Sequence, residues 1–531
     1  MKDKRKLKLK KFYFHPITVF LFLVLITILM SGILSAAEMQ ATYNVVNPNT
    51  KDLEPTLVAV ENLLSYDGIK FLISNAAVNF LSFGPLGMLL ISLLGITIAE
   101  GTGLIETFTR RHLSKIPKST FTFIVLFVAT ISSLINEVGY TILIPLMALI
   151  YFINGRNPIL GIVTSFCGVS FGYGVSIFVG STEIALIEYT KKAALLLDEN
   201  IHIALTSNLI FIIVASIILS IIGTIIIERI IAPKIGKYKR DDDFSKTEQY
   251  RPITIEEAEQ MQIEKDKNEK KGLRYALIST ILVILAFIYA LIPNLPYSGM
   301  LLDMQETTYM NQLFGENAYF QDGFTYIVSL IFILSGIAYG IGSKTIKNDK
   351  EIIENASKKF SKIGSVLMLI FVASQFIALF RKSNIGTIVT AWLANSLEYL
   401  NITGIPLILV SMILIALANF FLTSPANKWL IFSPVMVPMF MQSNISPEFA
   451  QLVMRAGDSM TKGFTPLLAS FIIYLGYLNI YNLQKDKPYT IRQSLKMITP
   501  YFLLISLTWI LLVIGWYIIG LPIGPGVNPT I

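Results

Sequence analysis

The feature that most constrains this chain is the recurrence of apolar blocks long enough to cross a lipid bilayer. A helix of about 20 apolar residues spans the roughly 30 Å hydrocarbon core of a membrane. Soluble helices this apolar would need burial on every side. We therefore predict an all-α integral membrane protein with about nine transmembrane helices. The blocks lie at residues 19–36, 84–98, 121–135, 205–227, 276–292, 326–341, 366–380, 405–422, 467–478 and 501–519.

Composition and charge placement agree with a membrane protein. Of 531 residues, 53% are hydrophobic and 15% are charged, whereas soluble domains are about 25% charged. Loops rich in Lys and Arg are usually cytoplasmic. We predict a multi-pass protein of the cell (inner or plasma) membrane with a cytoplasmic N-terminus, polar external segments at 38–70 and 293–324, and no nucleic-acid partner. The basic clusters that carry the net charge of +8 lie at residues 1–11, 110–118, 234–274, 344–362 and 485–496.

The first apolar block has two interpretations. It follows a basic start and ends in Leu34, Ser35, Ala36 and Ala37, which also suits a cleaved secretory signal. We favour a retained helix, because the block is long for a signal core and the rest of the chain is membrane-embedded as well. The single cysteine, Cys167, lies in an apolar run, which excludes a disulfide framework and a thiolate metal cluster.

The chain divides into four parts. Residues 1–13 form a basic cytoplasmic N-terminus and residues 14–233 form a first membrane repeat. Residues 234–273 form a charged cytoplasmic linker, and residues 274–531 hold the remaining membrane helices with a second repeat. The linker could be a regulatory loop, but we favour a solvated connector, because mixed charge with little apolar content cannot bury a core.

Two segments of the chain match at a constant offset of 289 residues without gaps. Interrupted helices survive in a membrane only where they line a protein-enclosed or watery cavity, and matched interruptions point to a transporter's binding site. We predict an inverted repeat with two re-entrant helical hairpins, at about 137–157 and 424–446, and a transport site between them. The matched breakers and small residues are Pro145, Pro158, Gly168, Ser170 and Gly174 with Pro434, Pro447, Gly457, Ser459 and Gly463.

Charged residues inside membrane segments are costly and usually functional. Arg455, Asp458 and Lys462 follow one another at helical spacing and should share one helix face. They could form an ion or solute site, or an internal salt bridge that neutralises itself. Glu137 and Glu183 are candidate carboxylates of the first half, although Glu183 could instead lie at the external surface.

Enzyme motifs lack their required context. Residues 168–172 fit the Gly-x-Ser-x-Gly pattern, which needs a strand-to-helix elbow and a triad histidine. Neither is expected in a membrane helix. We also find no metal-ligand spacing and no phosphate-binding loop, so we predict no cofactor and no enzymatic activity, but transport driven by an H⁺ or Na⁺ gradient. A channel is the competing class, because broken helices can build one as well.

Several stretches resemble one family. The second-half run 432–440, followed by Arg455, Asp458 and the run 465–467, is similar to the aminobenzoyl-glutamate transporter (AbgT) family. The resemblance covers essentially the whole chain. It implies a bowl-shaped homodimer with nine spans and two hairpins per protomer. It also implies uptake of p-aminobenzoyl-glutamate and export of sulfonamide antimetabolites, the alternative being a carrier of another small carboxylate such as a dicarboxylate or peptide-like solute. The other matching runs are 15–16, 79–87, 99–105, 132–146, 155–158 and 428–429.

The resemblance also implies roles for particular residues. Asn419 and Asp458 would help to hold a cation such as Na⁺, with Glu137 and Glu183 as further candidate cation ligands. The family usually has Asp at the latter two positions, so the charge here is moved by about one methylene. The candidate residues of the solute pathway are Trp429, Arg455, Pro447, Pro466, Ser424, Lys428 and Glu183.

Overall fold

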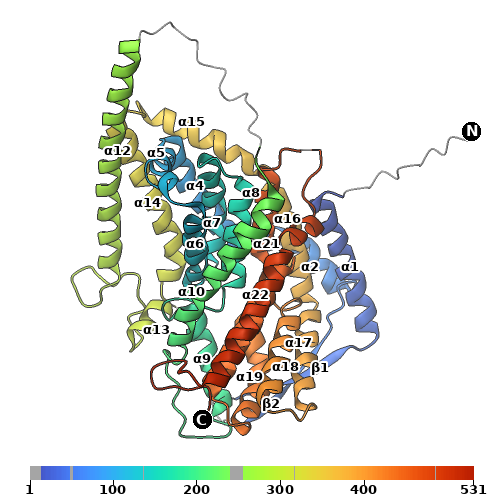
Figure 1. Ribbon diagram of the computed structural model, residues 1–531. Coiled ribbons are helices and arrows are strands. Elements are labelled where there is room, and N and C mark those ends of the chain that lie inside the picture. The colour runs from blue at the N-terminus through green and yellow to red at the C-terminus, as the bar shows by residue number, and fades with distance from the viewer. Residues whose placement is uncertain (1–13, 48–51, 136, 239–254, 316, 485) are drawn as a thin grey trace, which may run out of the picture.

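The computed structural model describes residues 14–47, 52–135, 137–238, 255–315, 317–484 and 486–531. The predicted N-terminal segment 1–13 and part of the predicted linker lie outside these residues. Figure 1 shows a bundle of helices lying side by side, with α1 (Pro16–Ala36) at one edge and α12 (Ile255–Ala290) at the other. The outer end of α12 rises beyond the bundle.

Within the described ranges, nine helices are long and apolar enough to cross a membrane, as the sequence predicts. Most coincide with the predicted apolar blocks. The block at 405–422 is an exception, because its helix α18 (Gly404–Ala418) has only 15 residues. The nine are Pro16–Ala36, Gly84–Gly101, Lys118–Ile135, Leu209–Ile235, Gln262–Ala290, Phe320–Ser343, Gly364–Lys382, Pro447–Ile480 and Ile491–Ile519.

The remaining elements are shorter. A two-stranded antiparallel sheet, β1 (Gln40–Val46) with β2 (Leu53–Ala59), lies in the first predicted external segment. Within the described residues, no second sheet is found. The other helices are α2 (Tyr66–Ser74), α3 (Ala76–Leu81), α5 (Leu104–Arg111), α7 (Val138–Ile153), α8 (Pro158–Phe171), α9 (Ser181–Ala194), α13 (Tyr309–Phe314), α15 (Asp349–Phe360), α17 (Ile385–Glu398) and α19 (Pro425–Gln442).

Three of the nine spans are composite. The span 118–135 consists of α6 (Lys118–Ile131) and the 3-10 turn η2 (Ser132–Ile135), and the span 209–235 consists of α10 (Leu209–Ile226), η3 (Ile227–Ile231) and α11 (Ala232–Ile235). The span 447–480 is interrupted between α20 (Pro447–Thr461) with η6 (Lys462–Phe464) and α21 (Ala469–Ile480). Four further spans are single helices: α4 (Gly84–Gly101), α14 (Phe320–Ser343), α16 (Gly364–Lys382) and α22 (Ile491–Ile519). Two short 3-10 turns are η1 (Leu113–Lys115) and η5 (Ser361–Ile363).

The predicted linker is partly helical. Its residues from 255 onward belong to α12, so the helix begins well before the predicted boundary at residue 273. Charged residues join this end of α12 to α5, where Arg110 and Arg111 both bind Glu269. Hydrogen bonds to Glu269 and then to Asp266 raise the pKa of Arg111 above its ordinary value.

Five consecutive helices of the first half have counterparts about 289 residues later in the second half. Helices α6, α7, α8, α9 and α10 correspond to α18, α19, α20, α21 and α22. The counterparts also exchange contacts, since α19 packs on α9 while α7 packs on α21. This reciprocity is the packing expected of two repeats related by a pseudo-two-fold axis.

Matched glycines show the same reciprocity in atomic detail. A Cβ on Gly174 would lie 2.5 Å from Oγ of Ser459, and a Cβ on Gly463 would lie 2.7 Å from Cβ of Ser170. At the offset of 289 residues these two contacts are equivalent. The glycines therefore allow the two repeats to approach closely where they meet, as small residues do between membrane helices.

Candidate functional site

The site forms where the second repeat interrupts its helices. Helix α18 ends at Ala418, with Asn419 as its C-cap, and α19 begins at Pro425 after a short break. Ser424 caps α19, its side chain accepting a 3.4 Å hydrogen bond from the backbone N–H of Asn427. Proline at the first helical position needs no N–H partner, so this start is locally favoured. The cap brings Lys428 into the first turn, facing α20.

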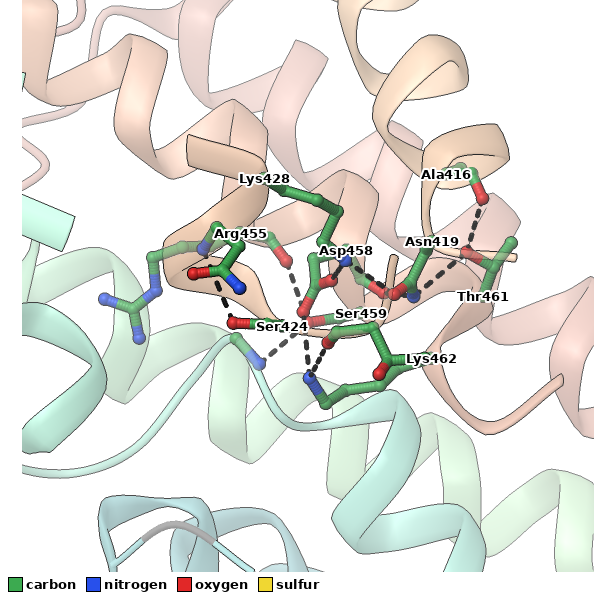
Figure 2. Close-up of polar contacts among 12 residues, drawn as sticks. Ala416, Asn419, Ser424, Lys428, Arg455, Asp458, Ser459, Thr461 and Lys462 are labelled. Carbon is green, nitrogen blue, oxygen red and sulfur yellow. Dashed lines mark hydrogen bonds and ion pairs between the residues drawn. The ribbon is translucent and has the colours of Figure 1, made fainter. Parts of the chain in front are cut away.

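Lys428, Asp458 and Asn419 meet in the interior, as Figure 2 shows. The Lys428 ammonium forms an ion pair with Oδ1 of Asp458 and donates a 2.5 Å hydrogen bond to Oδ1 of Asn419. Asn419 in turn donates through Nδ2 to the backbone oxygen of Asp458 at 2.8 Å. The Lys428 side chain is 0% exposed and that of Asp458 is 3% exposed. The buried ammonium of Lys428 thus joins the end of α18, the first turn of α19 and the middle of α20.

A second ammonium completes the cluster. Lys462 Nζ lies 3.3 Å from Oδ2 of Asp458 and 3.6 Å from the centre of the Tyr173 ring. Positions 173 and 462 are equivalent under the repeat, so their contact lies close to the pseudo-two-fold axis. The carboxylate of Asp458 therefore bridges two cations. This is the internal salt bridge that the sequence left open as an alternative, extended by Lys428.

Arg455 does not join this cluster, although helical spacing placed it on the same face as Asp458. Its guanidinium points away from Lys428 and Asp458 in Figure 2 and forms an ion pair with Oε1 of Glu183 on α9. Glu183 is 5% exposed, so the alternative of a surface position for it does not hold. Its other oxygen accepts a 2.7 Å hydrogen bond from the Gly180 N–H and caps α9.

The guanidinium of Arg455 retains two free donors. Its side chain is 4% exposed, and neither Nε nor Nη1 has a hydrogen-bond partner among the described residues. Unsatisfied buried donors are rare and costly in native proteins. A buried arginine with two unpaired donor nitrogens is therefore suited to bind an anionic or carbonyl oxygen of a solute.

Trp429 and Glu137 connect the two repeats on either side of the cluster. Trp429 on α19 is fully buried and donates from Nε1 to Oγ1 of Thr190 on α9 at 2.8 Å. Glu137 precedes α7 and accepts a 3.0 Å hydrogen bond from Oγ of Ser470 on α21. Glu137 and Asn419 therefore have different hydrogen-bond partners, and no hydrogen bond between them is found among the described residues.

The predicted prolines shape the helix ends. Pro447 is the first residue of α20 and is buried. Pro466 lies in the interruption between η6 and α21, where the missing proline N–H needs no helical partner. Pro434 and Pro438 lie inside α19, as Pro145 lies inside α7. Pro447 and Pro466 thus lie where helices begin or are interrupted, whereas the three internal prolines lie within continuous helices.

Sequence reasoning missed several partners in the site. Thr190 and Ser470 are ordinary polar residues on helices, and no pattern marks them. Tyr173 could have been found, because the offset of 289 residues places it opposite Lys462. Helix α9 itself was missed because its mixed composition gives no apolar block.

The residues at Asn419 and Asp458 do not fit the Na⁺ that the resemblance implies. Both oxygens that would bind the ion already accept the ammonium of Lys428. No group of three or more His, Cys, Asp or Glu side chains with metal-site geometry is found within the described ranges. The Lys428 ammonium takes the position between them instead.

The fold and this site define a class of protein. Nine candidate spans, a repeat with interrupted helices and a buried charged cluster at the repeat interface are typical of secondary transporters. The chain is therefore a multi-pass membrane transporter and not an enzyme.

Comparison with known proteins identifies the family. Residues 10–531 match the family described as "AbgT putative transporter family", and the chain belongs to this family. It is 29% identical over 518 residues to the p-aminobenzoyl-glutamate transport protein of Escherichia coli K12, covering 97% of this chain and 94% of the relative.

Two solved structures are also similar to this chain. The YdaH transporter of Alcanivorax borkumensis is 28% identical, with 96% of this chain and 100% of that chain covered and a TM-score of 0.47. MtrF of Neisseria gonorrhoeae, described with a class of antimetabolite efflux pumps, is 28% identical, with 97% and 98% covered and a TM-score of 0.47.

Proposed function

We propose that this chain is a gradient-driven secondary transporter of p-aminobenzoyl-glutamate and related compounds. The observation that best supports the proposal is Arg455, a buried arginine with two unpaired donor nitrogens beside the interface of the repeats. A glutamate moiety supplies carboxylates for such donors. The Escherichia coli relative named for this solute matches nearly the whole chain and supports the proposal. The alternative is an ion-coupled carrier of another small carboxylate, such as a dicarboxylate or a peptide-like solute.

Trp429 is linked to the helix that carries Arg455 through Thr190 and Gln451. Trp429 is held by Thr190, and Thr190 also donates to Oε1 of Gln451 on α20 at 3.1 Å. Gln451 lies one helical turn before Arg455, so the indole and the guanidinium lie near each other across α9 and α20. An aromatic amine with an attached dicarboxylate matches this pairing of an aromatic surface with a cation. Ser424, Pro447 and Pro466 would act by positioning the helix ends that enclose it.

The test compares two solutes in proteoliposomes. With an H⁺ or Na⁺ gradient imposed, Arg455→Ala should reduce uptake of p-aminobenzoyl-glutamate by about 100-fold, since a charge-assisted contact contributes about 3 kcal/mol. Uptake of an uncharged sulfonamide, the predicted exported class, should fall much less. Arg492→Ala, at an exposed position of α22, is the matched control and should leave both rates unchanged.

Two outcomes would contradict the proposal. Equal losses for both solutes would show that Arg455 does not recognise the carboxylates. Absence of saturable counterflow, with unitary currents in its place, would show a channel. Preference for a dicarboxylate over p-aminobenzoyl-glutamate in the same vesicles would select the alternative solute.

We also propose that the transporter is a homodimer of the cell membrane with its N-terminus in the cytoplasm. The basic loops support this orientation through the positive-inside rule. Cysteine labelling from each side of intact cells, with the single native Cys167 replaced, would test it.

A further inference from the structure

We propose that the ammonium of Lys428 is the resident cation of the Asn419–Asp458 site, so that this transporter does not bind Na⁺ there. The inference deepens the proposed function, on which it rests for the meaning of the site in transport. It concerns which cation this chain uses, and it starts from the contact that does not fit Na⁺.

The ammonium meets the requirements of a cation at this position. It has three N–H donors and, here, two acceptors in the side-chain oxygens of Asn419 and Asp458. The orientation of the Asn419 side chain is also fixed, because its Nδ2 donates to the backbone oxygen of Asp458 and, at 3.3 Å, to Oγ1 of Thr461. The amide oxygen is therefore aimed at the ammonium, with the orientation that a free cation would need.

The position of Lys428 is held by its helix. Its backbone N–H donates to the Ser424 oxygen at 3.1 Å in the first turn of α19. Its side chain is entirely buried, between the end of α18 and the middle of α20. For Na⁺ to enter, this ammonium would have to give up both acceptors and stay buried without them, which is unfavourable for a charge.

Formal charge at the repeat interface leads to the same conclusion. The cations Lys428, Lys462 and Arg455 are matched by the carboxylates Asp458, Glu183 and Glu137. Glu137 lies within electrostatic range of Lys462 and also of Arg381, so it is already shared between two cations. A free cation added between Asn419 and Asp458 would therefore have no carboxylate left to neutralise it, and an unpaired buried charge is strongly disfavoured.

A tethered cation has a consequence for transport. A free ion can leave with the solute, whereas the Lys428 ammonium moves with α19. The contact between α19 and α20 is then broken or formed only by movement of the hairpin itself. Uptake should therefore be independent of Na⁺.

The test measures ²²Na⁺ binding to the purified full-length protein in detergent, which needs no transport. The wild type should show no saturable binding. Lys428→Asn removes the ammonium, keeps an oxygen ligand and should create saturable Na⁺ binding, with a rise in melting temperature of about 2 °C or more in Na⁺ over choline. Adding Asp458→Asn to this variant should abolish both signals. Lys350→Asn, at an exposed position of α15, is the matched control and should bind no Na⁺.

Saturable ²²Na⁺ binding by the wild type that Asp458→Asn removes would overturn the inference, and so would a folded Lys428→Asn protein that binds no Na⁺. If Lys428→Asn does not fold, wild-type uptake with choline in place of Na⁺ decides. A rate within twofold supports the inference, and a loss of tenfold or more overturns it. Binding and transport are separate readouts, so a failure of the proposed solute leaves the Na⁺ result interpretable.

Discussion

The two repeats share a backbone plan and differ in what they bury at its centre. In the second repeat Lys428 meets Asp458, whereas the equivalent residues of the first repeat are Gly139 and Val169. These two also lie together, because a Cβ on Gly139 would be 3.0 Å from Cγ2 of Val169. The equivalent contact, between α19 and α20 in the second repeat and between α7 and α8 in the first, is thus ionic in one repeat and apolar in the other.

The difference extends to the other charged positions. Arg455 and Lys462 correspond to Phe166 and Tyr173 in the first repeat. The first repeat contributes carboxylates instead, and it presents Glu137 and Glu183 to helices of the second. The comparison teaches that a symmetric scaffold carries one asymmetric site, in which the second repeat supplies the cations and both repeats supply carboxylates.

The largest expected effect comes from making the second repeat resemble the first. Asp458→Val removes the carboxylate that pairs with two buried ammonium groups, Lys428 and Lys462, so we expect a loss of about 3–5 kcal/mol in the free energy of unfolding. Thermal unfolding of the purified protein in detergent would measure it. Replacing both lysines with methionine in the same protein should restore much of this stability, since an apolar replacement of a buried ion cluster is often neutral.

This prediction also has a clear contrary result. If the single and triple variants unfold at the same temperature, the lysines are not destabilised by the loss of Asp458. The ion pairs of Asp458 would then make no net contribution to the stability of the second repeat.

A smaller effect is expected at the apolar centre of the first repeat. Gly139→Ala would place a Cβ 2.0 Å from Oγ of Ser132, so we expect overpacking to cost about 1–3 kcal/mol. Gly87→Ala on α4 is the matched control, because its Cβ would meet nothing within 4 Å. The control should be neutral or slightly more stable, as alanine favours helix over glycine. Equal melting temperatures for the two variants would contradict the close contact.

The smallest effect is expected at the contact of Trp429 with the first repeat. Trp429→Phe removes the donor to Thr190, so we expect a loss of about 0.6 kcal/mol, the average for hydrogen bonds between membrane helices. A double-mutant cycle with Thr190→Val would isolate the pair. A coupling energy of zero would show that the indole is held by packing alone.

Several features were predictable because they depend on local pattern. The nine spans follow from the length of apolar blocks, and the repeat follows from matched prolines and glycines. The re-entrant course of the hairpins and the homodimer stay predictions. Helices α9 and α17 were not predicted, because neither contains an apolar block of membrane-spanning length.

The sequence predicted which residues belong to the site, but it did not predict which of them contact one another. Helical spacing put Arg455 and Asp458 on one face, yet their side chains bind partners on different helices. Lys428 was assigned to the solute pathway, and its contact with Asn419 and Asp458 could not be read from spacing, because nine and thirty residues separate them.

By itself, the sequence determined that this chain is a membrane transporter of two related halves, because the bilayer requires long apolar helices and tolerates breaks only in enclosed places. Only the tertiary structure decided which charges meet. Ion pairing depends on the packing of α18, α19 and α20 against α9, and a buried charge selects the nearest opposite charge in space and not in sequence. The apolar blocks predict the membrane-spanning helices. The packing of these helices places the Lys428 ammonium between Asn419 and Asp458, where the sequence predicted a free cation.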